Sequence, residues 1–235
     1  RTMDFQKLKE NVKAVKAMGN IHQHLDLIAG LPLEDYDSFA KSYQAVYEME
    51  PDQLQLGFLK VLKGSPMHGR TGEYGMDYWD SPPYEVLKTR WLSYGELRKL
   101  KQVEEMTEVY YNSGQFSGTM QLLGREYDNP FDLYRELGEY YSARGLDGRS
   151  HSRLERYEIL LAFIREKWPK KLPLYQDLLL LDLYRREKVK SRPSWARDQK
   201  LWKEEMMAFF RGEEERRQYL KDYEGFDARQ MSKMA

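Results

Sequence analysis

A short segment that could contact a ligand lies at the end of the first strongly apolar stretch of the chain. It runs from Ile28 through Gly30 and Pro32 to Glu34, directly after the strand-like residues 21–28. In parallel α/β sheets, ligands bind at the carboxyl ends of the strands. Gly30 would let a ligand approach the backbone closely, Ile28 would offer an apolar surface, and Glu34 would lie where the next helix begins. An ordinary strand–turn–helix junction has the same pattern, and the pattern alone favours that simpler interpretation.

Three polar side chains share one face of the same predicted strand. His22, His24 and Asp26 alternate along the chain, and alternate residues of a strand point to the same side. Two histidines are too few for a structural zinc site, which takes four ligands. We therefore predict no metal site, and we expect structural polar residues or the lining of a substrate pocket. The pattern leaves open whether this face points into a barrel or at a layer of helices.

Other charged and aromatic residues have simple explanations. Lys60 and Lys63 could contact an anionic ligand, but surface lysines beside a turn are favoured. Three glutamates of one predicted helix are expected to form a solvated face: Glu104, Glu105 and Glu108. The Tyr110–Tyr111 pair could form an aromatic substrate surface, although aromatics at helical spacing more often form core. Residues 144–203 hold sixteen Lys or Arg against eight Asp or Glu, spread over several predicted helices, which favours a solvated basic face over a nucleic-acid site.

The composition excludes several classes of protein. The 235 residues carry zero formal net charge, with 32% charged and 14% aromatic residues, which is typical of a globular protein with a substantial core. Neutral charge argues against a general binder of nucleic acid or anionic membranes. The run of four leucines, Leu178–Leu181, is far too short to span a bilayer. The chain has no cysteine, which excludes disulfides, thiolate catalysis, cysteine-bound zinc and an iron–sulfur cluster held by this chain alone, and which fits a cytoplasmic protein.

Helices and strands alternate in the first part of the prediction. A helix over 4–18, a strand over 21–28, a helix opened by Glu34 and Asp35, and a strand over 53–61 follow one another. This alternation with short links is typical of a parallel sheet with crossover helices. Two strands do not make a stable sheet by themselves, so we expect further strands or a second copy of the chain to complete it.

Helices dominate the rest of the prediction. They follow a connector rich in Gly, Pro and Tyr and are expected over 83–112, 117–123, 130–143, 150–167, 173–188 and 194–220. The run Leu178–Leu181 makes its helix apolar all round, which predicts a central place in the helical domain. The predicted fold class is therefore α/β plus α.

Two segments resemble the radical S-adenosylmethionine (SAM) enzymes. Residues 24–34, HLDLIAGLPLE, resemble the fifth-strand motif of that superfamily, and residues 52–67, DQLQLGFLKVLKGSPM, resemble its sixth strand and the following loop. Residues 94–114 and 172–184 resemble the helical C-terminal domain of bacterial relatives that also carry an N-terminal cobalamin-binding domain. These relatives are often labelled as similar to the magnesium-protoporphyrin ester cyclase. The resemblance implies a partial SAM barrel over 1–67, a connector over 68–82 and a helical C-terminal domain over 83–235.

The resemblance also implies a role for individual residues. Ile28 would pack on the adenine of SAM. Gly30 and Pro32 would form the turn that meets the cofactor, and Glu34 would help to shape that loop. The sixth strand would add backbone contacts to the adenine near its end, between Phe58 and Lys60. One difference is minor, because Leu33 stands where many relatives have glycine.

A larger difference concerns the cluster. The superfamily binds a 4Fe–4S cluster through a CxxxCxxC loop after its first strand, and this sequence lacks that loop. We therefore expect a fragment of an enzyme whose parent uses SAM, the cluster and, in the cobalamin-domain branch, cobalamin. The fragment is expected to bind none of these by itself, to be inactive alone and to contain no catalytic residue. The resemblance does not identify a substrate.

Two other functions remain open. The chain could be a non-catalytic helical interaction module in which the SAM motif is a coincidence. It could instead belong to a tRNA-modifying radical SAM enzyme, which predicts salt-sensitive RNA binding through four basic residues: Lys170, Lys171, Arg185 and Arg186. An uncovered edge of a parallel sheet also tends to pair, which predicts a homodimer.

Overall fold

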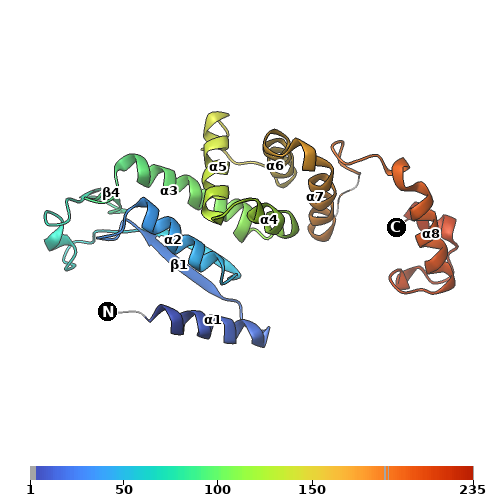
Figure 1. Cartoon of the computed structure of the whole chain (residues 1–235), viewed down its shortest axis with the longest axis horizontal. Coiled ribbons are helices and arrows are strands. Elements are labelled where there is room, and N and C mark those ends of the chain that lie inside the picture. Colours follow the sequence, from blue (N-terminus) through green and yellow to red (C-terminus); the bar gives the residue numbers. More distant parts are fainter. Residues whose placement is uncertain (1–3, 188, 190, 235) are drawn as a thin grey trace. The chain divides into compact units, whose positions relative to one another are not determined.

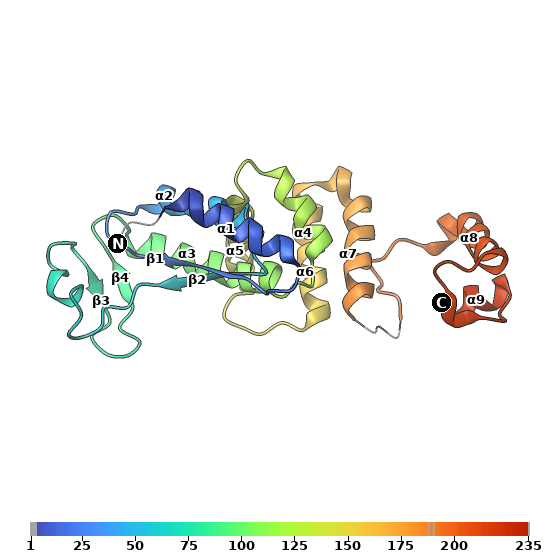
Figure 2. The same cartoon turned by 90° about the horizontal axis from the view of Figure 1, so that it is seen from below.

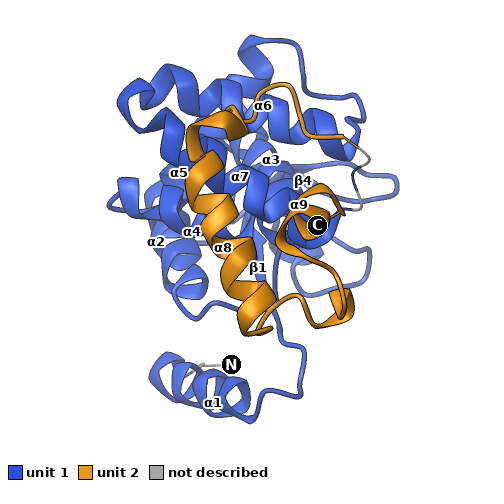
Figure 3. Cartoon of the chain, turned by 90° about the vertical axis from the view of Figure 1, so that its right-hand side faces the viewer, with its two compact units in different colours: residues 1–190 blue, residues 191–235 orange. Residues whose placement is uncertain are grey.

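The computed structural model describes residues 4–187, 189 and 191–234, which fold as two compact units. Unit 1 comprises residues 1–190 and unit 2 comprises residues 191–235 (Figure 3). Unit 1 begins with a small parallel sheet and its helices and continues into a mostly helical part. The predicted α/β plus α class is confirmed.

Four elements form the α/β part of unit 1 (Figure 1): α1 (Phe5–Met18), β1 (His24–Ala29), α2 (Tyr36–Tyr47) and β2 (Gln53–Phe58). Asp4 accepts a hydrogen bond from the backbone N–H of Lys7 and caps α1, and Gly19 ends that helix in the left-handed conformation. The strands pair in parallel through the α2 crossover, with His24 beside Gln53 and Ala29 beside Phe58. Both strands are shorter than predicted, but the order of elements is as predicted.

The sheet has one covered and one open face. Ala29, Leu54 and Leu56 are buried on the face that α2 and α3 cover. His24 and Asp26 are exposed on the other face. The polar stripe predicted for β1 therefore points away from the helical layer.

The two edges of the sheet also differ. Within the described chain, β1 pairs with β2 alone. At the far edge of β2, the side-chain amide of Asn112 binds both backbone groups of Leu54. Its Oδ1 accepts from the backbone N–H of Leu54 at 2.9 Å, and its Nδ2 donates to the carbonyl of Leu54 at 3.0 Å. This amide makes the two hydrogen bonds that a neighbouring strand would otherwise make.

A small antiparallel hairpin lies at the carboxyl end of the sheet. It consists of β3 (Asp77–Tyr78) and β4 (Val86–Lys88), and Figure 2 shows it beyond the end of β1. The backbone N–H of Val86 donates to the carbonyl of Leu59 at 2.9 Å, which attaches β4 to the chain just past β2. The prediction of a helix from residue 83 is wrong here. Helix α3 begins only at Tyr94, where Ser93 and Glu96 form a reciprocal capping box.

Six further segments complete the helical part of unit 1: α3 (Tyr94–Thr107), the π-helical turn η2 (Glu108–Asn112), α4 (Ser117–Leu123), α5 (Pro130–Ala143), α6 (Arg153–Lys167) and α7 (Leu172–Arg186). The predicted boundaries of α4, α5, α6 and α7 agree within three residues. The prediction that α7 is buried on all sides is wrong. Leu174, Leu181 and Tyr184 are exposed, because α7 turns only one side inward, and that side includes the buried carboxylate of Asp182.

Unit 2 contains two helices, α8 (Lys203–Glu215) and α9 (Ala228–Met234), around a small core of Phe210, Ala228 and Met231. The helix predicted over 194–220 is therefore too long. It ends early because the buried carboxylate of Glu213 accepts hydrogen bonds from the backbone N–H groups of Gln218, Tyr219 and Leu220, which fixes a turn. None of the helices that the structure describes is long and apolar enough to cross a membrane.

Candidate functional site

The turn that follows β1 is shaped by a glycine. Gly30 is buried and has a φ of +89°, a conformation that side-chain-bearing residues rarely adopt. A Cβ atom at this position would lie 2.6 Å from Cγ1 of Val86 in β4. Glycine is thus required both by the backbone conformation and by the hairpin that packs on the turn. The close approach that the sequence predicted is made by Val86 of this chain.

The neighbours of Gly30 form the rest of the turn. Ile28 is 46% exposed and lies beside Gly57 on the open face of the sheet. Pro32 is half-buried, and Leu33 is exposed with a φ of +70°, which is the conformation expected where relatives have glycine. Glu34 precedes α2, whose N-cap is Asp35.

Glu34 is a partly buried carboxyl group. Its Oε1 accepts a hydrogen bond from Oγ of Ser42 at 3.1 Å. Burial raises the pKa of Glu34, the bond from Ser42 opposes this change, and the nearby charge of Asp35 adds to it. The carboxyl group thus ties the turn to α2, as expected for a residue that shapes this loop.

The end of β2 lies beside the end of β1. Phe58 pairs with Ala29, and Nζ of Lys101 lies 5.0 Å from the centroid of the Phe58 ring. Lys60 is exposed and forms a backbone bridge with Glu85. The side chain of Phe58 is on the covered face with that of Ala29, whereas Ile28 is on the open face. The structure therefore brings the predicted residues to one end of the sheet but places them on both of its faces.

A pocket of about 270 Å³ lies along the outer edge of β2, next to Asn112. His24, Gln53 and Gln55 line it together with Glu104 and Glu108 of α3 and η2. Burial raises the pKa of Glu104, and the nearby charges of Glu108 and Glu105 raise it further. The prediction of a solvated glutamate face is therefore wrong for Glu104 and Glu105, which are half-buried, and holds for the exposed Glu108.

The histidine stripe does not form a metal-binding cluster. The rings of His22 and His24 meet edge to face with centroids 4.8 Å apart, and Nδ1 of His22 lies 3.8 Å from Oδ2 of Asp52. In the part of the chain that the structure describes, no group of three or more His, Asp or Glu side chains is arranged to hold a metal ion.

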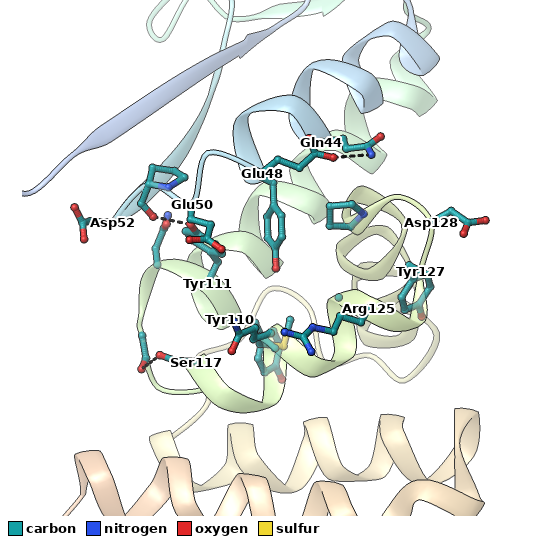
Figure 4. Close-up of a pocket in the computed structure, with 18 residues that line it drawn as sticks. Gln44, Glu48, Glu50, Asp52, Tyr110, Tyr111, Ser117, Arg125, Tyr127 and Asp128 are labelled. Carbon is teal, nitrogen blue, oxygen red and sulfur yellow. Dashed lines mark hydrogen bonds between the residues drawn. The ribbon is translucent and has the colours of Figure 1, made fainter. Parts of the chain in front are cut away.

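A larger pocket of about 720 Å³ lies at the opposite end of the sheet, where β2 begins (Figure 4). It is formed by the end of α2, the loop to β2, η2, α4 and the segment before α5. This pocket could not be predicted from the sequence because its residues come from five separate segments. One hint was present, because Tyr111 of the Tyr110–Tyr111 pair lines it while half-buried.

The basic residues of the later helices are in part paired with acidic partners. Lys171 contacts Oε1 of Glu126 at 2.6 Å, and Arg186 donates to the carbonyl of Ser113 at 2.9 Å. Lys170 and Arg185 are exposed. Glu126 offsets the charge of Lys171, whereas the carbonyl of Ser113 holds Arg186 in place without neutralising it.

Comparison with protein families assigns most of the chain. Residues 72–235 match the model of a family described as a protein of unknown function, DUF4080. The chain belongs to the DUF4080 family. Within it, the DUF4080 region contains the β3–β4 hairpin and all helices from α3 onward, while β1, β2 and the Gly30 turn precede the match. Val86 of the DUF4080 region is thus the residue that packs on the turn. A comparison with curated proteins gave no match for the chain.

Proposed function

We propose that this chain is part of a radical SAM enzyme, in which β1 and β2 belong to the SAM-binding barrel and the DUF4080 region covers the substrate. The observation that carries the proposal is the one-sided sheet. It is parallel, covered by helices on one face only, and paired along β1 with no strand but β2 among the described residues. Parallel sheets normally have both faces covered and more than two strands. Such a sheet fits as one sector of a larger barrel.

Helix α1 supports the same arrangement. Its apolar stripe contains Phe5, Val12 and Met18, and of these only Val12 is buried. An amphipathic helix normally packs its apolar stripe against a core. Further elements of a barrel would give α1 and the open edge of β1 the partners that they lack in this chain.

The carboxyl end of the sheet would hold SAM. Ile28 would pack on its adenine, the turn of Gly30 and Pro32 would lie against it, and Glu34 would support that turn. SAM bound there would be the source of the radical. The ligands of its 4Fe–4S cluster would come from outside these 235 residues, because they include no cysteine.

The DUF4080 region has the position of a cover. Its hairpin packs on the Gly30 turn through Val86, and Glu104 and Glu108 line a pocket at the outer edge of β2. A cover in this position would exclude water from the reacting substrate. The sequence resemblance extends the proposal to cobalamin as a second cofactor and to a cytoplasmic enzyme.

The coding sequence upstream of residue 1 provides the first test. A CxxxCxxC segment should lie about one hundred residues earlier, because each preceding βα unit takes about thirty residues. If the open reading frame contains no such segment, the radical SAM proposal fails.

Binding of SAM provides the second test. In the protein that carries this chain, purified with its cluster, Ile28→Asp should weaken SAM binding about ten-fold or more, because a carboxylate would lose its hydration against the adenine. Leu154→Asp is a matched control, since Leu154 is 51% exposed on α6 and Ile28 is 46% exposed. Equilibrium dialysis with labelled SAM measures both variants. Equal SAM binding by the unsubstituted protein and by Ile28→Asp would contradict the placement of Ile28 in the SAM site.

A helical interaction module is a second candidate. The exposed residues Leu174, Leu181 and Tyr184 form an apolar stripe on α7, and such stripes often bind partners. This function requires no SAM, so the SAM-binding measurement separates it from the first proposal. The tRNA-modifying alternative has less support, because Lys171 and Arg186 already have partners within the chain.

A further inference from the structure

A short segment of the DUF4080 region, residues 84–86, lies against both parts of the chain that are proposed to meet SAM. It pairs in antiparallel fashion with residues 59–61, which continue β2. The backbone N–H of Val61 donates to the carbonyl of Tyr84 at 2.8 Å. Lys60, near which the adenine contacts are proposed, lies in the middle of this pairing. Segment 84–86 therefore fixes the backbone at the end of β2.

The last residue of the segment also reaches the other proposed SAM contact. Val86 is 2% exposed and lies against Gly30. The atoms nearest to a Cβ added at Gly30 would be Cγ1 of Val86 at 2.6 Å and Cβ of Leu59 at 3.7 Å. The Gly30 turn and the end of β2 are thus held in position by the same three residues of segment 84–86.

Helix α3 is joined to this segment at two points. The carboxylate of Glu85 forms an ion pair with Lys101 of α3, whose Nζ also lies 5.0 Å from the centroid of the Phe58 ring. The link from β4 to α3 is a tight turn, in which the hydroxyl of Thr89 accepts from the backbone N–H groups of residues 91 and 92 at 3.1 and 3.0 Å. We therefore expect α3 and segment 84–86 to move together, because packed and hydrogen-bonded elements transmit displacements.

We infer that Val86 is a positioning residue of the SAM site, and that segment 84–86 transmits displacements of α3 to the cofactor. This inference rests on the proposed function, because it concerns the affinity of the Gly30 turn for SAM. A substrate that contacts the DUF4080 region and displaces α3 would shift the turn and the end of β2 together. Binding of substrate and of SAM would thus be coupled, and such coupling acts in both directions.

Hydrogen exchange tests the coupling without knowledge of the substrate. The sample is the protein that carries this chain, purified with its cluster. SAM should slow exchange in residues 28–34, which would contact it, and also in residues 84–88, which an ordered turn would hold more firmly. Helix α6, which packs on α7, is the internal reference and should exchange at the same rate with and without SAM.

Substitution of Val86 tests the role of its side chain. Val86→Ala removes the contact with Gly30 and should weaken SAM binding about five-fold or more, the lower end of couplings between sites. Val86→Ile keeps a carbon atom at both γ positions and should bind SAM within about two-fold of the unsubstituted protein. Equilibrium dialysis with labelled SAM measures both variants.

Val46→Ala is the matched control. Val46 is also buried, at 7% exposure, and loses the same atoms on substitution. It lies near the end of α2, which leads to the amino end of β2 and so away from the Gly30 turn. Val46→Ala should therefore bind SAM as tightly as the unsubstituted protein does.

The outcomes separate this inference from the proposed function. The inference alone is wrong if SAM slows exchange in residues 28–34 but not in residues 84–88. It is also wrong if Val86→Ala binds SAM as tightly as Val46→Ala, or if Val86→Ile loses as much affinity as Val86→Ala. If the unsubstituted protein does not bind SAM and shows no change in residues 28–34, the inference and the proposed function are both wrong.

Discussion

The carboxylate of Asp182 replaces the N-cap that α4 lacks. Phe116 occupies the N-cap position and offers no side-chain acceptor. Asp182, from α7, is buried and accepts from the backbone N–H of Gly118 at 3.0 Å, from that of Thr119 at 2.9 Å and from the Thr119 hydroxyl at 2.8 Å. One side chain thus joins two helices that are distant in sequence.

Removal of this carboxylate should be among the most destabilising single changes in unit 1. Asp182→Ala is expected to lower the free energy of unfolding by about 2–3 kcal/mol, because two buried N–H groups lose their acceptor. Thr119→Val removes only the hydroxyl bond and should lower it by about 1 kcal/mol. Urea denaturation followed by circular dichroism measures both. Equal losses in the two variants would contradict this role of Asp182.

Glu104 should make stability depend on pH. Its pKa is raised in the folded chain, so its favourable contribution is complete below the unfolded pKa and is lost as pH rises through the folded pKa. Glu104→Gln should therefore stabilise the chain at pH 7 and have little effect near pH 4. Thermal denaturation at the two pH values tests this, with Glu158→Gln on the exposed side of α6 as the control. A stabilisation that is equal at both pH values would exclude the titration of Glu104 as its cause.

At the scale of the elements, the Gly30 turn links the sheet to the DUF4080 region. Gly30→Ala would create both backbone strain and a clash with Val86 and should cost about 2–4 kcal/mol. Gly19→Ala separates the two effects, because Gly19 has a φ of +70° and no atom within 4 Å of the added Cβ. It should cost about 1–2 kcal/mol.

A double variant isolates the clash. In a chain that carries Val86→Ala the clash is absent, so Gly30→Ala should cost less stability there than in the otherwise unchanged chain. Chemical denaturation of the two single variants and the double variant measures this coupling. If Gly30→Ala costs no more than Gly19→Ala, the hairpin does not constrain the turn.

The elements that carry local start and stop residues could be predicted from sequence. Asp4 and Gly19 bound α1 as expected, and Asn129 with Pro130 opens α5. The β3–β4 hairpin was missed because β4 lies within the helix predicted over 83–112, whereas the Ser93–Glu96 capping box marks the true start of α3. Its strands have only two and three residues, too few for a periodic pattern.

The candidate sites were predictable to different degrees. The Gly30 turn could be located because strand, glycine and helix start are contiguous in sequence. The partner of Gly30 could not be, because Val86 is separated from it by the whole of α2 and β2. The 720 Å³ pocket depends entirely on tertiary packing, which brings Glu48 and Arg125 to opposite walls.

At the scale of the whole molecule, we expect the two units to differ in their free energy of unfolding. The core of unit 2 has three buried apolar residues, and small domains bury too little surface to be robust. Met231→Ala should cost about 2–5 kcal/mol, which is enough to unfold unit 2 locally. Met231 is 0% exposed, whereas Met234, the matched control, is 58% exposed.

Hydrogen exchange measured by mass spectrometry tests this difference. Met231→Ala should accelerate exchange throughout α8 and α9 and leave the protection of α5 and α6 unchanged. Met234→Ala should leave all four helices protected. Faster exchange of α5 in Met231→Ala would show that the two units unfold as one.

Asn112 gives the small sheet a direction of growth. Because its amide occupies both outward backbone groups of Leu54 in β2, we expect an additional strand, from this polypeptide or another, to join beside β1. Two copies that paired through their β1 strands would occupy both free β1 edges, so a third copy could not join the sheet. Pairing of this kind ends at two chains and cannot propagate into a fibril. A single asparagine thus sets an upper limit on assembly through this sheet.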